Sequence, residues 1–200
     1  VVNETNFRRI LKLTLVDKGK EKVIEAIKKL EKRNDVISVA PDYYASFSTS
    51  STNDLFVEEQ WAIEKIGLPQ AWEITTGSSL VKVGVIDSGI DADHSDLINR
   101  VNRSLSRSFS EDNVSPFTDI IGHGTHVAGI IGAQSNNQIG VTGACWNITL
   151  VSLKVDNANG SIKKSYMVSA ISYATQVNIP ILNCSIGFEG EYDTDIELAI

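Results

Sequence analysis

The 200-residue sequence contains only two cysteines, Cys145 and Cys184, so it is not a scaffold held together by several disulfides. The two residues could pair if they were close in space. Isolated cysteines are more often small, buried free thiols, and we expect that state here. No apolar run is long enough to cross a bilayer, so the sequence predicts no membrane-spanning segment.

The sequence also lacks an excess of basic residues. It has 18 Lys and Arg against 25 Asp and Glu, and this net charge of −7 argues against nucleic-acid binding. Residues 1–40 hold ten Lys and Arg against six Asp and Glu, a net charge of +4, and the remaining residues carry −11. Segments of opposite charge attract each other, so we expect residues 1–40 to have an intramolecular partner.

A start methionine and a leader segment are absent as well. The chain begins at Val1 and shows no charged-then-apolar signal, and it stops within an apparently helical pattern over residues 194–200. We expect both ends to be cut from a longer protein. The missing leader therefore does not argue against export.

The first part of the chain has the pattern of a small β-α-β unit. Leucines alternate with polar residues over 10–16, which indicates a half-buried strand. Residues 21–33 place apolar side chains on one stripe of an amphipathic helix, and residues 36–40 read as a second strand. Such a small unit needs a partner to cover its sheet. We expect a Ser- and Thr-rich, cleavable linker at 47–53, after a first domain at 1–46.

Residues 54–200 show strands alternating with helices, which predicts an α/β fold with a parallel sheet and helices on both faces. The expected strands lie at residues 81–86, 148–155 and 179–183, and the expected helices at 69–76, 123–133 and 162–176. In such sheets, functional groups collect just past the carboxyl ends of the strands. Asp87, Asp156 and the residues 183–185 fall at these positions.

His123 stands between Gly122 and Gly124 at the start of a small-residue, apolar helix pattern. Glycines let backbone or substrate approach closely, and Thr125 is placed to cap the helix. A fixed histidine can carry a proton near neutral pH. A single histidine beside a helix is nevertheless more often structural, and zinc binding by His123 with His126 is a further alternative.

Asp87 closes an apolar strand and is followed by the turn residues Ser88 and Gly89. A partly desolvated carboxylate needs a hydrogen-bond donor, and an imidazole N–H is one. Such a pairing would hold the imidazole in one tautomer and stabilise its protonated form. An aspartate that only caps its own turn is the alternative, but His123 in the same sheet favours the pair.

Residues 83–90 and 123–129 resemble the aspartate and histidine signatures of the subtilisin-like serine proteases. Members of this family carry their triad in the order Asp, His, Ser, and the first two appear here in that order. The resemblance covers nearly the whole chain. Residues 1–46 resemble the ferredoxin-like inhibitory propeptide of these enzymes, and residues 54–200 resemble the amino-terminal part of the catalytic domain.

The resemblance implies roles for individual residues. Asp87 orients the imidazole, His123 acts as general base and acid, and His126 is structural. Two segments become the edges of the substrate cleft, where the main chain of an extended peptide pairs as an added strand. These edges are formed by Asn159, Gly160 and Ser161 on one side and by Ser185, Ile186 and Gly187 on the other.

The resemblance also implies a structural calcium site at Asp96 and the loop 134–141, and no catalytic cofactor. Its ligands would be Asp96, Asn137, Ile139 and Val141, with Asp54 as a further candidate. Carboxylate, amide and carbonyl oxygens are the ligands that calcium prefers. This loop is one residue longer before Asn136 than the usual pattern, and a polar turn after a helix is the alternative reading.

The sequence has no Gly-Thr-Ser-Met-Ala type motif for the nucleophile and no asparagine for the oxyanion hole, and the resemblance places both beyond residue 200. Because triad members act as a unit, we expect this fragment to be inactive. The expected whole is a secreted or cell-surface serine endopeptidase zymogen, with polypeptide substrates and its own propeptide as partners. We expect self-cleavage between Tyr44 and Asn53.

Two other functions are open. A non-catalytic relative could keep the fold for binding or regulation, although an intact Asp87 and His123 argue against this. Alternatively, the short chain could itself be an inhibitor that acts through residues 1–46.

Overall fold

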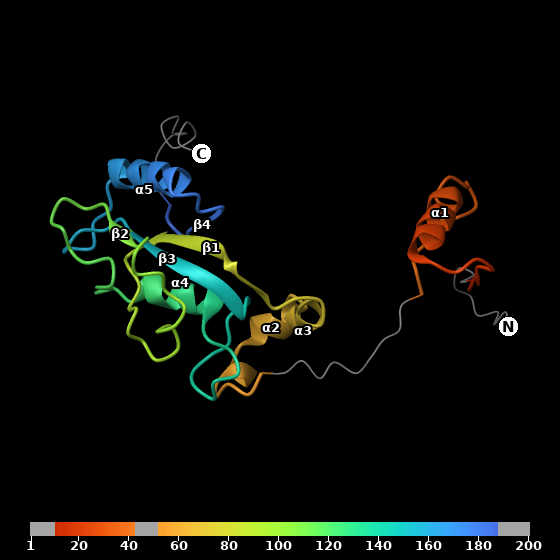
Figure 1. Ribbon diagram of the computed structural model, residues 1–200, viewed down its shortest axis with the longest axis horizontal. Helices are drawn as coiled ribbons and strands as arrows, with labels where there is room; N and C mark the ends of the chain where they lie inside the picture. The colour runs from red at the N-terminus through yellow and green to blue at the C-terminus, as the bar shows by residue number, and fades with distance from the viewer. Residues whose placement is uncertain (1–10, 43–51, 188–200) are drawn as a thin grey trace. The chain divides into compact units, whose positions relative to one another are not determined.

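The computed structural model describes residues 11–42 and 52–187 and divides the chain into two compact units, Val1–Phe47 and Ser48–Ile200 (Figure 1). Each unit is described by itself. Of the expected linker at 47–53, only Thr52 and Asn53 lie within the described residues.

The first unit contains the helix α1 (Lys20–Leu30), which confirms the amphipathic helix. Its half-buried side chains recur at helical spacing, at Val23, Ile27 and Leu30, while lysines occupy the opposite face. The strands expected at 10–16 and 36–40 are absent between residues 11 and 42, so that part of the prediction is wrong. Alternation marks a face but supplies no partner strand, and Leu11 and Leu13 remain 66% and 63% exposed.

The second unit is built on a four-stranded parallel sheet with the order β2-β3-β1-β4, which confirms the predicted α/β fold. The strands are β1 (Gly77–Asp87), β2 (Arg107–Ser108), β3 (Asn147–Lys154) and β4 (Ile181–Cys184). The central strand β1 therefore has β3 on one side and β4 on the other. Residues that follow β3 and β4 emerge on either side of Asp87.

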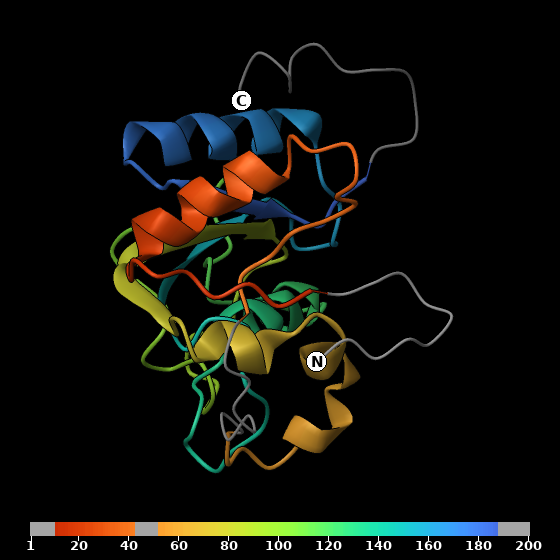
Figure 2. The same ribbon diagram turned by 90° about the vertical axis from the view of Figure 1, so that its right-hand side faces the viewer.

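Helices cover both faces of this sheet, as expected (Figures 1 and 2). Helix α4 (His123–Gly132) packs on the face that holds Val83, Val85 and Leu150. Helix α5 (Lys164–Gln176) packs on the other face, against a cluster that includes Ile86 and Leu153. Because successive strand residues point to opposite faces, the unbroken apolar runs of β1 and β3 supply both cores.

The start of the second unit and one short strand differ most from the sequence prediction. The helix expected at 69–76 is the shorter α3 (Leu68–Trp72), and Gly77 opens β1. Gly77 has φ +97°, and a Cβ there would lie 2.7 Å from the carbonyl oxygen of Asn147. Residues 91–120, where no helix or strand is predicted, contain β2, whose two residues are too few to leave a periodic pattern.

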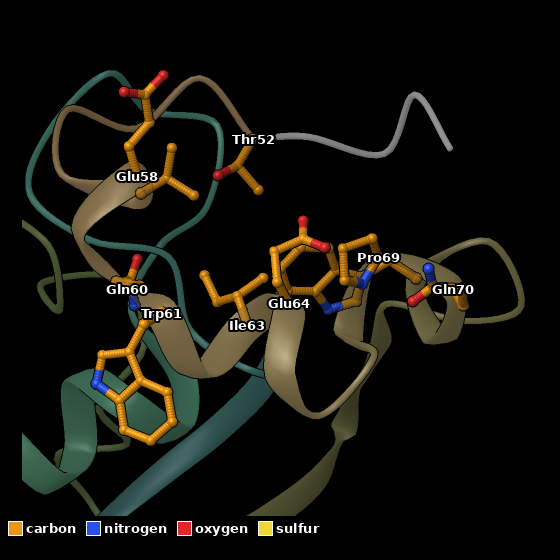
Figure 3. Close-up of a pocket in the computed structure, with 10 residues that line it drawn as sticks. Thr52, Glu58, Gln60, Trp61, Ile63, Glu64, Pro69 and Gln70 are labelled. Carbon is orange, nitrogen blue, oxygen red and sulfur yellow. The ribbon is translucent and has the colours of Figure 1, made fainter. Parts of the chain in front are cut away.

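The segment before the sheet forms η1 (Val57–Glu59), α2 (Trp61–Lys65) and α3. Trp72 anchors it to the domain, because its indole N–H donates to the carbonyl of Ala144 and its ring lies 4.9 Å from that of Trp146. A cavity of about 600 Å³ opens between these elements (Figure 3). None of the predicted site residues lines it.

No helix among the residues placed by the structure is long and apolar enough to cross a membrane.

Candidate active site

Asp87, the last residue of β1, and His123, the first residue of α4, form a hydrogen-bonded pair. The Nδ1 atom of His123 lies 2.7 Å from Oδ1 of Asp87. The Asp87 side chain is only 4% exposed, whereas the imidazole is 50% exposed. The carboxylate therefore lies beneath the ring, and the ring remains accessible to a reacting molecule.

This pairing sets the charge behaviour of the imidazole. The hydrogen bond to Asp87, its negative charge and the more distant charge of Asp119 raise the pKa of His123 above its ordinary value. Since a carboxylate only accepts, Nδ1 carries the proton and Nε2 is left as the basic nitrogen. The arrangement is suited to taking up one proton at Nε2 and releasing it again.

The close approach of α4 to the turn after β1 requires glycine. A Cβ at Gly124 would lie 2.1 Å from the carbonyl oxygen of Gly89 and 3.1 Å from Cβ of Asp87. Gly122 has φ +80°, a backbone conformation that favours glycine. The expected approach of backbone is therefore confirmed, and it brings His123 to the carboxylate.

Ser88 and Asp119 fasten the start of α4 to this turn. The Ser88 hydroxyl donates to Asp119 Oδ1 at 2.8 Å and accepts the N–H of Gly124 at 2.9 Å. Asp119 also accepts the N–H groups of Gly122 and Thr125 and the hydroxyl of Thr125. Asp119 thus satisfies N–H groups at the helix start. The capping role predicted for Thr125 is wrong, because its hydroxyl donates to Asp119 and accepts the N–H of Asp91, which lies outside the helix.

Asp119 was not among the predicted site residues. Burial alone would raise its pKa, but hydrogen bonds from Thr125, Ser88 and Gly122 outweigh burial and lower the pKa. A negative charge at a helix amino terminus is also favourable. The signal in the sequence was an aspartate shortly before a glycine-flanked helix start, in a segment for which no helix or strand is predicted.

The expected cleft edge after β3 is a tight turn. The Asn157 side-chain oxygen accepts the N–H groups of Asn159 and Ser161, and Gly160 has φ +75°. A Cβ at Gly160 would lie 3.1 Å from Cδ1 of Ile121, so the turn lies against the segment that leads into α4.

The other expected edge follows β4. The Asn183 amide donates to the Ser185 hydroxyl at 2.9 Å, and Ile186 packs on the core beneath α5. At Gly187 an added Cβ would meet nothing within 4 Å. Because β3 and β4 flank β1, the two segments emerge on opposite sides of Asp87.

Several of the residues predicted to bind calcium lie close together. Asp96 is buried and accepts the amide N–H of the Asn137 side chain at 2.8 Å and the N–H of Val141 at 2.9 Å. Asp54, also buried, accepts the backbone N–H of Asn137 at 2.9 Å. The Ile139 N–H donates to the Asn137 side chain. One loop therefore collects two buried carboxylates around Asn137.

The remaining candidate residues, His126 and the two cysteines, do not form a common site. His126 is exposed on α4, and within residues 11–42 and 52–187 no three His, Cys, Asp or Glu side chains are grouped to hold a metal. Cys145 and Cys184 are free thiols, and Cys184 is exposed where a buried thiol was expected. Partial burial of its sulfur and the charge of Asp87 raise the pKa of Cys184, against one backbone hydrogen bond, so it is a poor nucleophile at neutral pH.

The pairing of Asp87 with His123 predicts how the imidazole titrates. His123 should titrate above the ordinary histidine pKa of 6.5, and Asp87→Asn should lower its pKa, because it removes the negative charge that favours the protonated imidazole. The raised pKa adds stability that is present in full below pH 6.5 and is lost as the pH rises through the pKa of the folded state. NMR titration of the imidazole carbon-bound protons in the intact protein measures the pKa.

Asp93→Asn is the matched control, because this exposed carboxylate pairs with Arg103 rather than with the imidazole. It should leave the pKa of His123 in place. An equal pKa in the parent and in Asp87→Asn would show that the pair does not form.

The sequence also matches a known protein family and several known proteins. Residues 78–198 match the sequence model of the subtilase family. The chain is 31% identical over 178 residues to the thermophilic serine proteinase of Bacillus sp. (strain AK1), a match that covers 88% of this chain and 43% of that protein. It is 31% identical to halolysin of Haloferax mediterranei over 84% of this chain and 32% of that protein.

Subtilisin E of Bacillus subtilis is 36% identical over 82% of this chain and 40% of its own length. The chain thus spans less than half the length of these relatives. The family match includes Asp87 and His123 and extends over more than half of the chain. This protein belongs to the subtilase family.

Proposed function

We propose that the chain is the amino-terminal portion of a serine endopeptidase zymogen. The observation that carries this proposal is the buried carboxylate of Asp87 bonded to Nδ1 of the half-exposed His123. In an Asp–His–Ser triad, this bond orients the imidazole and stabilises its protonated form during acyl transfer. The names of the three relatives, which include a serine proteinase and a subtilisin, are consistent with it.

In this mechanism, His123 takes the proton from a serine hydroxyl as the serine attacks a peptide carbonyl. The protonated imidazole then donates to the leaving amine, and water hydrolyses the acyl-enzyme by the reverse route. We infer that the serine lies beyond residue 200. Residues 1–200 alone should then hydrolyse no peptide bond at a measurable rate.

In the whole protein, Asp87→Asn should lower kcat by about 10⁴-fold and His123→Ala by about 10⁶-fold, each with little change in KM. Both residues act on the transition state rather than on substrate binding. The measurement is steady-state hydrolysis of a chromogenic peptide, with folding verified by circular dichroism.

Asp93→Asn removes an exposed carboxylate of the same domain and should keep kcat within about twofold of the parent. A whole protein that folds but hydrolyses no peptide would favour the second candidate, a non-catalytic subtilase-fold protein used for binding or regulation.

The two segments that flank Asp87 are proposed to hold the substrate. The turn with Asn159, Gly160 and Ser161 and the stretch Ser185, Ile186 and Gly187 would each offer backbone groups to an extended peptide. Their positions after the two strands beside β1 support this role. Such recognition through the main chain accepts many side chains, as a general endopeptidase requires.

Residues 1–46 are proposed to be the inhibitory propeptide, and 47–53 the linker cut during maturation. The opposite net charges of residues 1–40 and 41–200 support an intramolecular partnership. The match to the thermophilic serine proteinase covers 88% of the chain, which is more than the second unit alone comprises. The similarity to that protease therefore continues into the first unit.

Maturation should produce a new amino terminus between Tyr44 and Asn53. Mass spectrometry of the purified whole protein locates it, and His123→Ala should abolish the cut because the same active site performs it. Full activity of a protein whose 44–53 segment remains intact would exclude this role for the linker.

A structural calcium ion is proposed at Asp96 and the loop 134–141. Two buried carboxylates, the Asn137 amide and the carbonyls of Ile139 and Val141 form the donor set that calcium prefers. Close packing of the loop on Asp96 supports this, since a Cβ at Gly140 would lie 2.3 Å from Oδ2 of Asp96.

Calcium at about a hundredfold excess over its dissociation constant should stabilise the protein by about 2.7 kcal/mol, and a chelator should reverse the effect. Asp96→Asn should remove the calcium dependence of Tm, and Asp93→Asn should keep it. Thermal unfolding with calcium, magnesium or chelator provides the test. The same Tm in all three conditions would show that the loop is only a polar turn.

We also propose that the mature enzyme is secreted or held at the cell surface. Extracellular modules bind calcium with dissociation constants of about 10⁻⁴–10⁻³ M, and a structural calcium site in this range is occupied outside the cell.

A further inference from the structure

Lys154 and Asp156 form a buried ion pair that the proposed triad chemistry does not use. Lys154 ends β3 and has 0% of its surface exposed, and Asp156 has 1%. The Lys154 ammonium contacts Oδ1 of Asp156 and donates to the carbonyl oxygen of Ser88 at 2.7 Å. Lysine is very rarely buried to this extent without a partner.

The pair is not explained by stability alone. Removing two charges from water has a large free-energy cost, and proteins in which apolar residues of similar volume replace a buried ion pair are often as stable or more stable. A buried ion pair is therefore better explained by the group that it holds in place. Here that group is the carbonyl of Ser88.

The parallel register brings the pair to the turn that carries Asp87. Asp87 is the register partner of Lys154 across the sheet. The N–H of Val155 donates to the carbonyl of Asp87 at 3.0 Å, and the Lys154 ammonium donates to the next carbonyl, that of Ser88. Two successive carbonyls at the end of β1 are therefore held from the end of β3.

Fixing the Ser88 peptide also fixes the groups around His123. Ser88 donates its N–H to Asp87 Oδ1 at 2.8 Å, and its hydroxyl joins Asp119 to the N–H of Gly124. A displaced Ser88 would move the carboxylate and the first turn of α4 relative to each other. An oriented catalytic pair tolerates little displacement, since about 1 Å can cost 10²-fold in rate.

We propose that Lys154 and Asp156 are positioning residues for the Asp87–His123 pair, acting through the Ser88 carbonyl. The catalytic consequence rests on the proposed peptidase function, whereas the effect on the geometry of the pair does not. Being buried, Lys154 does not itself contact a substrate.

The test compares Lys154→Met with Lys154→Met/Asp156→Val in the whole protein. The double variant removes both charges, so the net charge near His123 is unchanged, and Asp87 and Asp119 remain the acids that face the ring. It should recover much of the stability lost in the single variant, but not the donor to Ser88. We expect kcat about 10- to 100-fold below the parent with KM unchanged, and an NMR-measured pKa of His123 nearer to 6.5.

Ile171→Ala is the stability control. This buried residue of α5 belongs to the core on the face away from α4, so the variant is destabilised without touching Ser88. Its kcat and the pKa of His123 should stay at the parental values.

A double variant with parental kcat and a parental His123 pKa would overturn the proposal and leave the pair a structural feature. Peptidase activity with an unmoved pKa would contradict this inference and leave the proposed function intact. A shifted pKa in a protein without peptidase activity would support the positioning role while the proposed function fails.

Discussion

The approach of α4 to the end of β1 is the constraint on which the site depends. Gly124 leaves no room for a side chain against the carbonyl of Gly89, so the helix starts directly above Asp87. At this separation, the first residue of the helix reaches the last residue of the strand through a 2.7 Å hydrogen bond. A helix displaced by the width of one methyl group would leave the carboxylate buried without the imidazole.

The chemistry of the site follows from its unequal burial. Asp87 and Asp119 both accept hydrogen bonds from the turn and the helix start, and those to Asp119 lower its pKa. The imidazole is half exposed and is held from one side only. One nitrogen is therefore committed to the protein, and the other is available for proton transfer. The buried Lys154 contacts this arrangement at the Ser88 carbonyl and is paired with the buried Asp156.

Periodicity and motif spacing predicted much of the second unit. The apolar runs that became β1 and β3 were long enough to identify, and the histidine and aspartate motifs located the pair. The prediction of strands within residues 11–42 was wrong, because alternating leucines define one face of a segment but do not provide a partner strand. Short elements were missed for a similar reason. Strand β2 has only two residues, and its pairing with β3 rather than its own sequence makes it a strand.

The sequence by itself determined the residue types that chemistry requires, namely a carboxylate after an apolar strand and a histidine between glycines. The link from Ser88 to Asp119 and Gly124, and the lysine that contacts the Ser88 carbonyl, were decided only by the tertiary structure. Each of these contacts joins residues that are distant in the chain, such as Ser88 and Lys154. Their proximity depends on the register between parallel strands and on which face each side chain occupies. No local pattern in a single segment carries that information.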